Sequence, residues 1–534
     1  MVSLKQALAA LTAGMMVICL AACGQSGEGD GQLKSGELIV EENDSAIHLA
    51  LIGYDTLNPL VTQSATVQEY ISLIYEPLFD FDEAANPVPV LAKDYTLSPD
   101  GLTLRVELAD GIKWQDGRAF SAGDVVFTFQ EIKSRECAYS DDLENIAAAA
   151  AEGDRWVCFT LAKPLLNPEM LLSFPILPAG TEMRTGTGTD FQPVGTGPYG
   201  LDGEKTTANA LVLAANSQWH GGKPAADRIV LDVVRDKDAA VYAFEANEVN
   251  ALTSSTLDLK QSTPRGKFYV YDYTSNRLLF LGINNQSENF AQADVRRALG
   301  FMLNKQEMIE NEMYTHAVEV DVPVNPSAWF ARKLDKSRQA QADINQIMVS
   351  AGWEKQEDGF YYKTRDGEKI KFQTTVLVNG DNDEKNRLAR RIAGQLTMAG
   401  VETEVRAVSF QEYNRLIDSG DYSLFLGEVM LGKNMDPTFL TETSGEGNYF
   451  FYENAALNQR LSPASLTKDT EVRRQCFAEY GDLFLEETPF IPLFFRTESV
   501  IYDSRISGNK MPTLFRPYRD MDTWYFSKKD KTAD

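Results

Sequence analysis

The sequence predicts an α/β protein, and three observations lead to that prediction. The chain has 534 residues, of which 43% are hydrophobic and 24% are charged. This length exceeds what one hydrophobic core supports, so two or more domains are expected. Segments with a helical spacing of apolar residues alternate with segments in which apolar and polar residues alternate. That order is typical of α/β chains and predicts substantially parallel sheets.

Four elements are expected in the first quarter of the chain. Residues 47–53 have the composition of a first strand, and residues 67–79 carry apolar residues at a helical period. Residues 102–108 alternate between apolar and polar side chains, which indicates a half-buried strand. Ser121 precedes Asp124 by three positions, and this capping box predicts a helix that continues to about Ser134.

The second half of the chain gives stronger helix signals. A helix opens at Asp294, because apolar residues then recur at positions i, i+3, i+4, i+7 and i+8. A helix over 384–399 ends at Gly400, a residue that suits a C-terminal cap. The remaining expected elements are a strand over 401–407, a helix over 409–418 and a strand over 422–427.

The N-terminal residues predict export. Lys5 precedes an apolar run from Ala7 to Ala22, which is too short to span a bilayer comfortably, so residues 1–22 are interpreted as a signal peptide. The run ends Leu20-Ala21-Ala22-Cys23 and resembles the bacterial lipobox, in which the cysteine is acylated and becomes the new N-terminus. The alternative is a plain secretory signal. Residues 23–37 are rich in Gly, Ser and acidic side chains and are expected to form a flexible tether.

Charge and composition exclude several classes of partner and cofactor. The formal net charge of −26 disfavours nucleic acid and anionic membrane surfaces. It is interpreted as a solubility feature, with enrichment of cationic ligands as the alternative. Only three His are present, far apart, so neither a zinc site nor another metal site or cofactor is expected. Cys137 and Cys158 are either a disulfide or two free thiols.

Six short segments stand out along the chain: residues 110–127 (DGIKWQDGRAFSAGDVVF), 193–199 (PVGTGPY), 216–224 (NSQWHGGKP), 281–285 with 294–299 (LGINN and DVRRAL), 350–353 (SAGW) and 487–494 (ETPFIPLF). Together they resemble the peptide/opine/nickel class of extracellular solute-binding proteins, which serve ABC importers. The segments follow one another in the order found in that class, and the resemblance extends over about residues 45–503. Read without the family, the Gly-Thr-Gly-Pro-Tyr stretch is a turn in which glycine permits positive φ.

The resemblance implies a two-lobed, periplasmic-binding-protein-like fold of type II, in its large three-domain variety. Lobe 1 would comprise residues 38–279 and 490–534, with an inserted subdomain at about 61–193. Lobe 2 would comprise residues 280–489. The ligand would bind in the cleft between the lobes, and a hinge motion would close them around it.

The resemblance also locates a ligand-binding segment, in which this sequence departs from peptide-binding relatives. Those relatives carry an Asp four residues before the Pro of an Asp-Pro-x-x-Phe segment, and it pairs with the α-amino group of the peptide. Here that position is Lys433, and Met430 replaces a common Trp. We hypothesise that Lys433 disfavours an ammonium and attracts a carboxylate, phosphate or sulfonate. The alternatives are a one-residue loop shift, a Lys433 that points to solvent, or Glu428 or Asp436 supplying the missing charge.

Other ligand-binding candidates rest on weaker signals. Asn434 lies in the same segment as Lys433. Thr56 and Asn58 follow the first expected strand, and Thr196 lies in the glycine-rich turn. The set is completed by Asn284, near a crossover, and by Tyr449, in a stretch with Asn448 and Tyr452.

Together these observations predict an exported binding protein, lipid-anchored through Cys23 to the outer face of the bacterial cytoplasmic membrane. It would bind a peptide or other small polar solute and deliver it to an ABC permease and ATPase complex, as a monomer. No catalytic residue is assigned, since the sequence has neither a GxSxG nor an HExxH motif and few His general bases. The alternatives are a ligand-sensing receptor without transport and a secreted hydrolase that uses a carboxylate pair.

Overall fold

The computed structural model describes residues 46–183, 191–253, 267–333, 335, 337, 342–443 and 445–526. Ser45–Asp534 forms one compact unit. The expected signal peptide, the tether and Cys23 lie outside the described residues. Within the described ranges, no helix has the length and apolar character needed to span a bilayer.

The N-terminal sheet has four strands in the order β1-β10-β9-β8. Its strands are β1 (Ile47–Ile52), β8 (Tyr199–Leu201), β9 (Ala210–Ala215) and β10 (Arg228–Val234). Only β1 and β10 in this sheet pair in parallel. Helix α2 (Ala65–Tyr70) packs against β1 and continues as a 3-10 turn, η2 (Ile71–Leu73), while α4 (Lys237–Glu245) follows β10.

A second four-stranded sheet, fully antiparallel, has the order β4-β5-β7-β6. Its strands are β4 (Ala92–Leu97), β5 (Thr103–Leu108), β6 (Ile146–Glu152) and β7 (Trp156–Leu161). Helix α3 (Ala122–Lys133) packs on β6 and β7, and its capping box forms as expected: Ser121 accepts from the first turn while its own backbone N–H donates to Asp124. The neighbouring short elements are β2 (Phe79–Phe81), β3 (Pro87–Pro89), η3 (Asp141–Leu143) and η4 (Pro168–Leu172).

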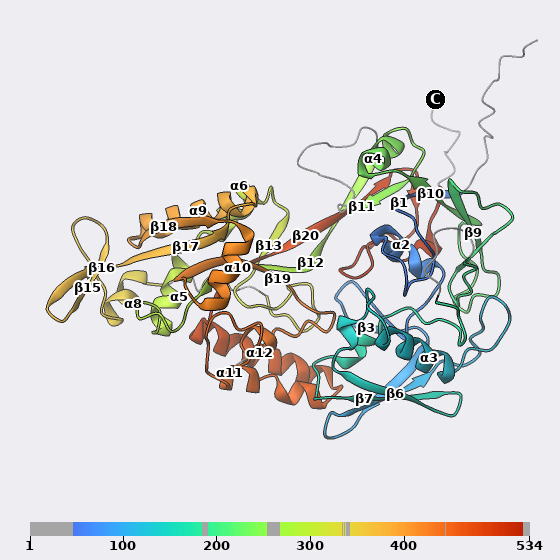
Figure 1. Ribbon diagram of the computed structural model, residues 1–534, viewed down its shortest axis with the longest axis horizontal. Coiled ribbons are helices and arrows are strands. Elements are labelled where there is room, and N and C mark those ends of the chain that lie inside the picture. Colours follow the sequence, from blue (N-terminus) through green and yellow to red (C-terminus); the bar gives the residue numbers. More distant parts are fainter. Residues whose placement is uncertain are drawn as a thin grey trace, which may run out of the picture. The chain divides into compact units, whose positions relative to one another are not determined.

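Two long strands dominate a seven-stranded sheet. β12 (Phe268–Ile283) and β20 (Ile491–Asp503) pair antiparallel along most of their length and lie side by side in Figure 1. β12 also pairs with β19 (Leu424–Met430), which continues the sheet to β17 (Gln373–Asn379) and β18 (Glu402–Val408). The short strands β11 (Ala251–Thr253) and β13 (Ala317–Glu319) pair with β20.

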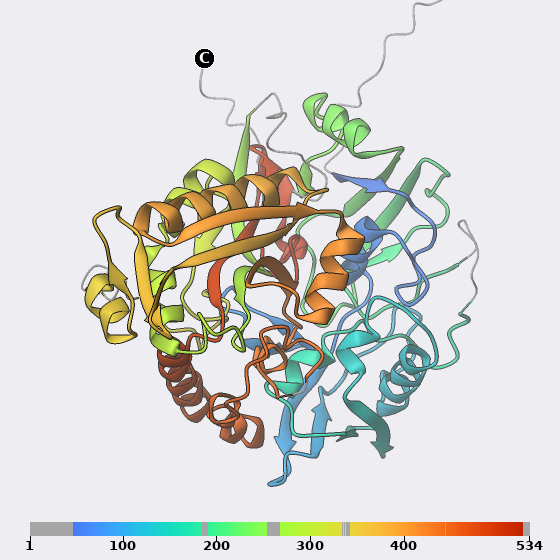
Figure 2. The same cartoon turned by 60° about the vertical axis from the view of Figure 1, so that its left-hand side comes forward.

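Helices cover both faces of this large sheet, because its strands bury alternate side chains on opposite sides. Leu279 and Leu281 of β12 join the cluster that contains helices α5 (Ala293–Met302) and α9 (Asp383–Ala399). Leu278 and Phe280 join the cluster that contains α10 (Phe410–Ser419) and α12 (Thr470–Glu487). Figure 2 shows α9 lying along the sheet. The helices are α5 (Ala293–Met302), α6 (Lys305–Glu312), α8 (Ile344–Ser350), α9 (Asp383–Ala399), α10 (Phe410–Ser419), α11 (Ala456–Gln459) and α12 (Thr470–Glu487).

The remaining elements are short. They are the hairpin strands β14 (Glu354–Lys355), β15 (Tyr361–Arg365) and β16 (Glu368–Lys371), the 3-10 turns η5 (Thr438–Leu440), η6 (Ser462–Leu466) and η7 (Met521–Thr523), and the C-terminal pair β21 (Ile506–Ser507) and β22 (Tyr525–Phe526).

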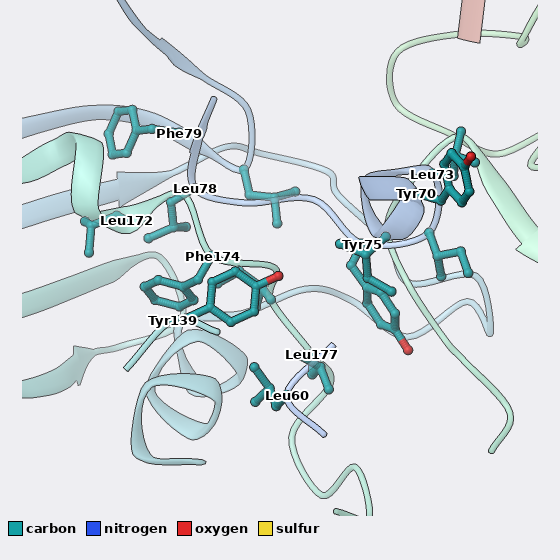
Figure 3. Packing of buried hydrophobic residues seen from close by; sticks show 14 of the residues in the cluster. Leu60, Tyr70, Leu73, Tyr75, Leu78, Phe79, Tyr139, Leu172, Phe174 and Leu177 are labelled. Atoms are coloured by element: carbon teal, nitrogen blue, oxygen red, sulfur yellow. The ribbon is translucent and has the colours of Figure 1, made fainter. Parts of the chain in front are cut away.

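The large hydrophobic cores divide the chain differently from the sheets. One core joins both four-stranded sheets and includes Tyr75, Tyr139 and Phe174, which Figure 3 shows among its buried side chains. A second core includes Phe81 and Met170 together with residues of α12, so the 79–172 stretch contributes to both. The predicted lobe boundaries stay a prediction. The boundary predicted between residues 279 and 280 falls within β12, and the strands of the seven-stranded sheet come from both predicted lobes.

Three expectations about secondary structure need correction. The helix expected over 67–79 ends at Leu73, four residues before Pro77. The strand expected over 422–427 starts and ends later, at Leu424 and Met430, because it follows its pairing with β12. The sheets are mixed: parallel pairing is confined to β1–β10, β17–β18 and β17–β19 among the described strands.

Candidate ligand-binding site

A cavity of about 280 Å³ is formed by stretches that are far apart in the sequence. Its walls come from residues between 68 and 81, from Ala138 and Tyr139, from residues between 173 and 175, from Lys433 and from residues 515–517. Most of the wall is apolar or aromatic. The charged side chains on it are Glu69, Asp80, Lys433 and Arg516.

Lys433 comes to this cavity from the loop after β19. Its Nζ lies 2.9 Å from a carboxylate oxygen of Asp142, in η3, and 5.1 Å from the centre of the Tyr139 ring. The Lys433 side chain is 23% exposed. An ammonium has three donors, so the pairing with Asp142 leaves Lys433 able to bind a further acceptor.

Arg516 reaches the same cavity from the C-terminal region, and sequence reasoning missed it. One terminal nitrogen of its guanidinium donates to Asp80, whose side chain is 13% exposed. The buried Nε of Arg516 and the buried Oγ of Ser173 have no hydrogen-bond partner among the described residues. Both residues line the cavity. Buried polar groups are normally hydrogen-bonded, so each of these two atoms lacks the partner that such a group usually has.

Glu428 and Met430 lie at the end of β19 and are not among the residues that line this cavity. Glu428 contacts Arg496 at 3.0 Å and Lys385 at 3.0 Å. Burial alone would raise the pKa of Glu428, but these two cations outweigh it and hold the pKa below its usual range. Met430 is 52% exposed. Glu428 is therefore engaged by protein cations.

Asn434 and Asp436 follow Lys433 in the chain, but neither lines the 280 Å³ cavity. Asp436 lines a different cavity of about 430 Å³ and accepts hydrogen bonds from the backbone and hydroxyl of Thr438, at 2.8 and 2.6 Å. Burial raises the pKa of Asp436. The Asn434 side chain donates to the backbone carbonyl of Leu166 at 3.1 Å. The backbone carbonyl of Asn434 accepts from the Asn167 side chain at 3.0 Å.

The candidates from the first third of the chain are buried in local networks. Thr56 is 2% exposed, and its hydroxyl accepts from the backbone of Asn58. Asn58 is fully buried, and its side-chain oxygen accepts from the Leu60 backbone at 3.0 Å. Thr196 is 1% exposed, and its Oγ1 has no hydrogen-bond partner in the described part of the chain.

The two remaining candidates also lie outside the cavity lining. The Asn284 side chain donates to the carbonyls of Gly420 and Tyr422, each at 3.2 Å, and thereby fixes the chain before β19. Tyr449 is 41% exposed, and its carbonyl accepts from the Tyr422 hydroxyl. Of all the residues predicted to bind ligand, the structure brings Lys433 alone to the lining of the 280 Å³ cavity.

The glycine-rich turn holds one wall of the cavity in place. Gly197 donates its backbone N–H to the carbonyl of Ile74 at 2.9 Å, directly before Tyr75. A Cβ at Gly195 would lie 1.7 Å from the same Ile74 oxygen. Glycine is required there by this close backbone approach, because neither Gly195 nor Gly197 has a positive φ.

Comparison with known proteins identifies the family. Residues 86–451 match the family described as "Bacterial extracellular solute-binding proteins, family 5 Middle". The chain belongs to this family. It is therefore a solute-binding protein with the two-lobed, type II fold, and solute binding for import is its function.

Relatives within family 5 resemble the chain along most of its length. The oligopeptide-binding protein AppA of Bacillus subtilis is 23% identical over 96% of this chain and 97% of its own length. The glutathione-binding protein GsiB of Escherichia coli K12 is 23% identical over 82% of this chain and 86% of its own. Among solved structures, the murein tripeptide-binding protein MppA in its unliganded open form has a TM-score of 0.75 at 17% identity, covering 90% of this chain and 97% of that one.

A nickel ABC transporter protein from Bacillus halodurans is similar at a TM-score of 0.74, with 20% identity, covering 90% of this chain and all of that one. Within the part of this chain that the structure describes, no group of three or more His, Cys, Asp or Glu side chains could hold a metal ion. Cys137 and Cys158 are free thiols.

Proposed function

We propose that this chain captures a peptide or another small polar solute in the cavity that Lys433 lines, and delivers it to an ABC permease and ATPase complex. The observation that carries the proposal is the arrival of Lys433 in that cavity. Lys433 occupies the position at which peptide-binding relatives carry the amine-binding Asp, and the walls of the cavity come from five separate stretches of the chain. Sites formed where distant segments meet are typical of ligand-binding proteins.

The charge at this position distinguishes the chain from relatives that hold a peptide through its α-amino group. Glu428 is occupied by Arg496 and Lys385, and Asp436 faces a different cavity. Neither carboxylate therefore replaces the missing amine ligand at the Lys433 cavity. The binding mode we propose does not hold a free peptide N-terminus in the manner of those relatives.

The location of the protein follows from residues outside the described ranges. Export by the leader, acylation of Cys23 and a tether over 23–37 would hold a monomeric binding protein at the outer face of the cytoplasmic membrane. Replacing Cys23 by Ala should release the protein from the membrane fraction of cells that express it. Retention of the variant in that fraction would contradict the anchor.

No catalytic step belongs to this proposal. The family binds solutes, and the role of the cavity is to hold its ligand unchanged. Incubation of the protein with a peptide pool, followed by mass spectrometry of the pool, should return every peptide intact. Cleavage products that require the folded protein would favour a hydrolase.

A matched pair of lysines tests where the solute binds. Lys468 pairs with Asp94 at 3.0 Å and lies 5.4 Å from the centre of the Tyr95 ring. This arrangement resembles that of Lys433 with Asp142 and Tyr139. Lys468, however, does not line the cavity. Native mass spectrometry and calorimetry with di- to pentapeptides should show binding that Lys433→Met weakens and Lys468→Met leaves unchanged. Equal affinity for all three proteins would refute the location.

A further inference from the structure

We infer that this cavity recognises a carboxylate through Arg516, Ser173 and Lys433, and that its ligand is a small amphipathic carboxylic acid whose binding does not depend on an amino group. The inference rests on the proposed function, because it names the substrate class of the same cavity. It adds two residues, Arg516 and Ser173, that lie outside the family's ligand-binding segment.

Two buried polar atoms of residues that line the cavity lack a hydrogen-bond partner among the described residues. Arg516 has five N–H donors, and one of its terminal nitrogens is fixed by Asp80. Its Nε–H is buried and lacks a partner within the described ranges, as does the Oγ of Ser173. A guanidinium presents its donors in a planar fork that fits the two oxygens of a carboxylate. A carboxylate in the cavity would accept from Arg516 and from the Ser173 hydroxyl together.

Lys433 brings a second cation to the cavity. It enters the cavity from a different part of the chain, and its ammonium keeps donors beyond the one directed at Asp142. Asp142 and Asp80 each hold one cation in place and so prearrange the site. A prearranged pair of cations loses less side-chain entropy when a ligand binds.

The rest of the cavity wall is mostly apolar. Tyr75 and Phe81 are 1% exposed, and the rings of Phe81 and Phe515 lie 4.4 Å apart. With Ile71 and Tyr139 they form a surface that an aliphatic or aromatic body would cover. At about 280 Å³, the cavity lies near the lower end of the roughly 300–1,000 Å³ found for small-molecule sites.

Glu69 offers the competing interpretation. It also lines the cavity, and its carboxylate lies 3.3 Å from the Thr253 hydroxyl. An ammonium bound at Glu69 would make the ligand's amino group essential instead of its carboxylate. The experiment below separates the two.

The test uses one pool of di- to tetrapeptides in three forms: unmodified, N-acetylated and C-terminally amidated. Native mass spectrometry and calorimetry of the purified full chain should show binding of the unmodified and N-acetylated pools and at least tenfold weaker binding of the amides. Binding of the amides with loss of the N-acetylated pool would overturn the inference and leave solute capture intact. If the wild type bound no pool, both the inference and the peptide-binding proposal would fall.

Variants assign the effect to residues. Arg516→Gln should weaken binding of the unmodified pool by about 10- to 100-fold, and Ser173→Ala by about 3- to 10-fold, as expected for lost charged and neutral hydrogen bonds. Both should reduce the preference for acid over amide, whereas Lys468→Met should not. Arg516→Gln leaves the Asp80 carboxylate without its cation, which could itself destabilise the fold or repel the ligand. The double variant Arg516→Gln with Asp80→Asn removes that unpaired charge and is therefore the second measurement. An unchanged acid-over-amide preference in Ser173→Ala and in this double variant would overturn the assignment.

Discussion

Two arginines of this protein, Arg473 and Arg516, each pair with a carboxylate from the 79–172 stretch, and they differ in how completely they are satisfied. Arg473 of α12 is 2% exposed, and its guanidinium donates to Glu169, to the Thr467 carbonyl at 2.8 Å and to Asn167 at 3.3 Å. Arg516 donates to Asp80, and its buried Nε lacks a partner in the described part of the chain.

The two arginines therefore illustrate a structural ion pair on the one hand and a candidate ligand-binding residue on the other. Both arginines place a charge inside the folded protein. If burial of the charge were the only criterion, Arg473 would be the stronger candidate for a binding residue, because it is more deeply buried. Its donors, however, are taken up by the protein, and it lines none of the cavities described here. Arg516 is the less buried of the two; it lines a cavity, and its buried Nε has no hydrogen-bond partner among the described residues.

Removal of Arg473 should cost the most stability of the changes considered. Arg473→Met would leave Glu169 buried without its cation, so the free energy of unfolding should fall by about 3–5 kcal/mol. Urea denaturation of the purified protein measures this, and ligand affinity under native conditions should stay within about threefold of the wild type.

A double variant is the control for Arg473. In Arg473→Met with Glu169→Leu, both charges are gone, so most of the lost stability should return. If the single variant were as stable as the wild type, Arg473 would not be a structural residue and the comparison would fail.

A smaller loss of stability is expected when the ion pair between Arg496 and Glu428 is removed. Like Arg473, Glu428 has its charge partners within the protein. Glu428 accepts from Arg496 and Lys385, which hold its pKa below the ordinary value of 4.5. Glu428→Gln should lower the free energy of unfolding at pH 7 by about 1.5–3 kcal/mol.

The pH dependence of that loss has a definite sign. A carboxyl group whose pKa is lowered by folding stabilises the protein above its ordinary pKa, and this stability is lost as the pH falls through the folded-state pKa. The difference between wild type and Glu428→Gln should therefore be full above pH 4.5 and shrink in more acidic solution. A difference that did not vary between pH 7 and pH 3 would contradict the pairing.

What the sequence could predict here follows from the range of the interactions involved. The ends of α9 and α10 were predictable because caps are local: Asn382 and Ser409 accept from the first turn of each helix, and Gly400 and Gly420 have positive φ at the ends. Strand pairing was not predictable, because the partners of a strand lie far away in the sequence. β19 pairs in parallel with β17, about 50 positions away, and antiparallel with β12, about 150 positions away. The expectation of substantially parallel sheets was therefore wrong.

The site divides in the same way. Lys433 could be found because it occupies a recognisable position in a short segment. Arg516 could not, since its partner Asp80 is 436 positions away and neither residue belongs to a local pattern. Ser173 gave no signal because what distinguishes it is the missing partner of a buried hydroxyl, which appears only once the chain is folded.

Asp436 lies in the same segment as Glu428, but its contribution to stability should be smaller and should depend on pH in the opposite direction. Burial raises the pKa of Asp436 above its ordinary value of 3.8. Stability from such a group is fully present below pH 3.8 and is lost as the pH rises through the folded-state pKa.

Asp436→Asn keeps an oxygen for the two hydrogen bonds from Thr438 and removes the charge. The variant should therefore unfold at a higher urea concentration than the wild type at pH 7, and the advantage should disappear below pH 3.8. Glu428→Gln, measured in the same buffers, is the control with the opposite sign. If Asp436→Asn were destabilising at pH 7 and neutral in acid, as Glu428→Gln is expected to be, the ionised Asp436 would be stabilised by a cation, and the 430 Å³ cavity it lines would need a new interpretation.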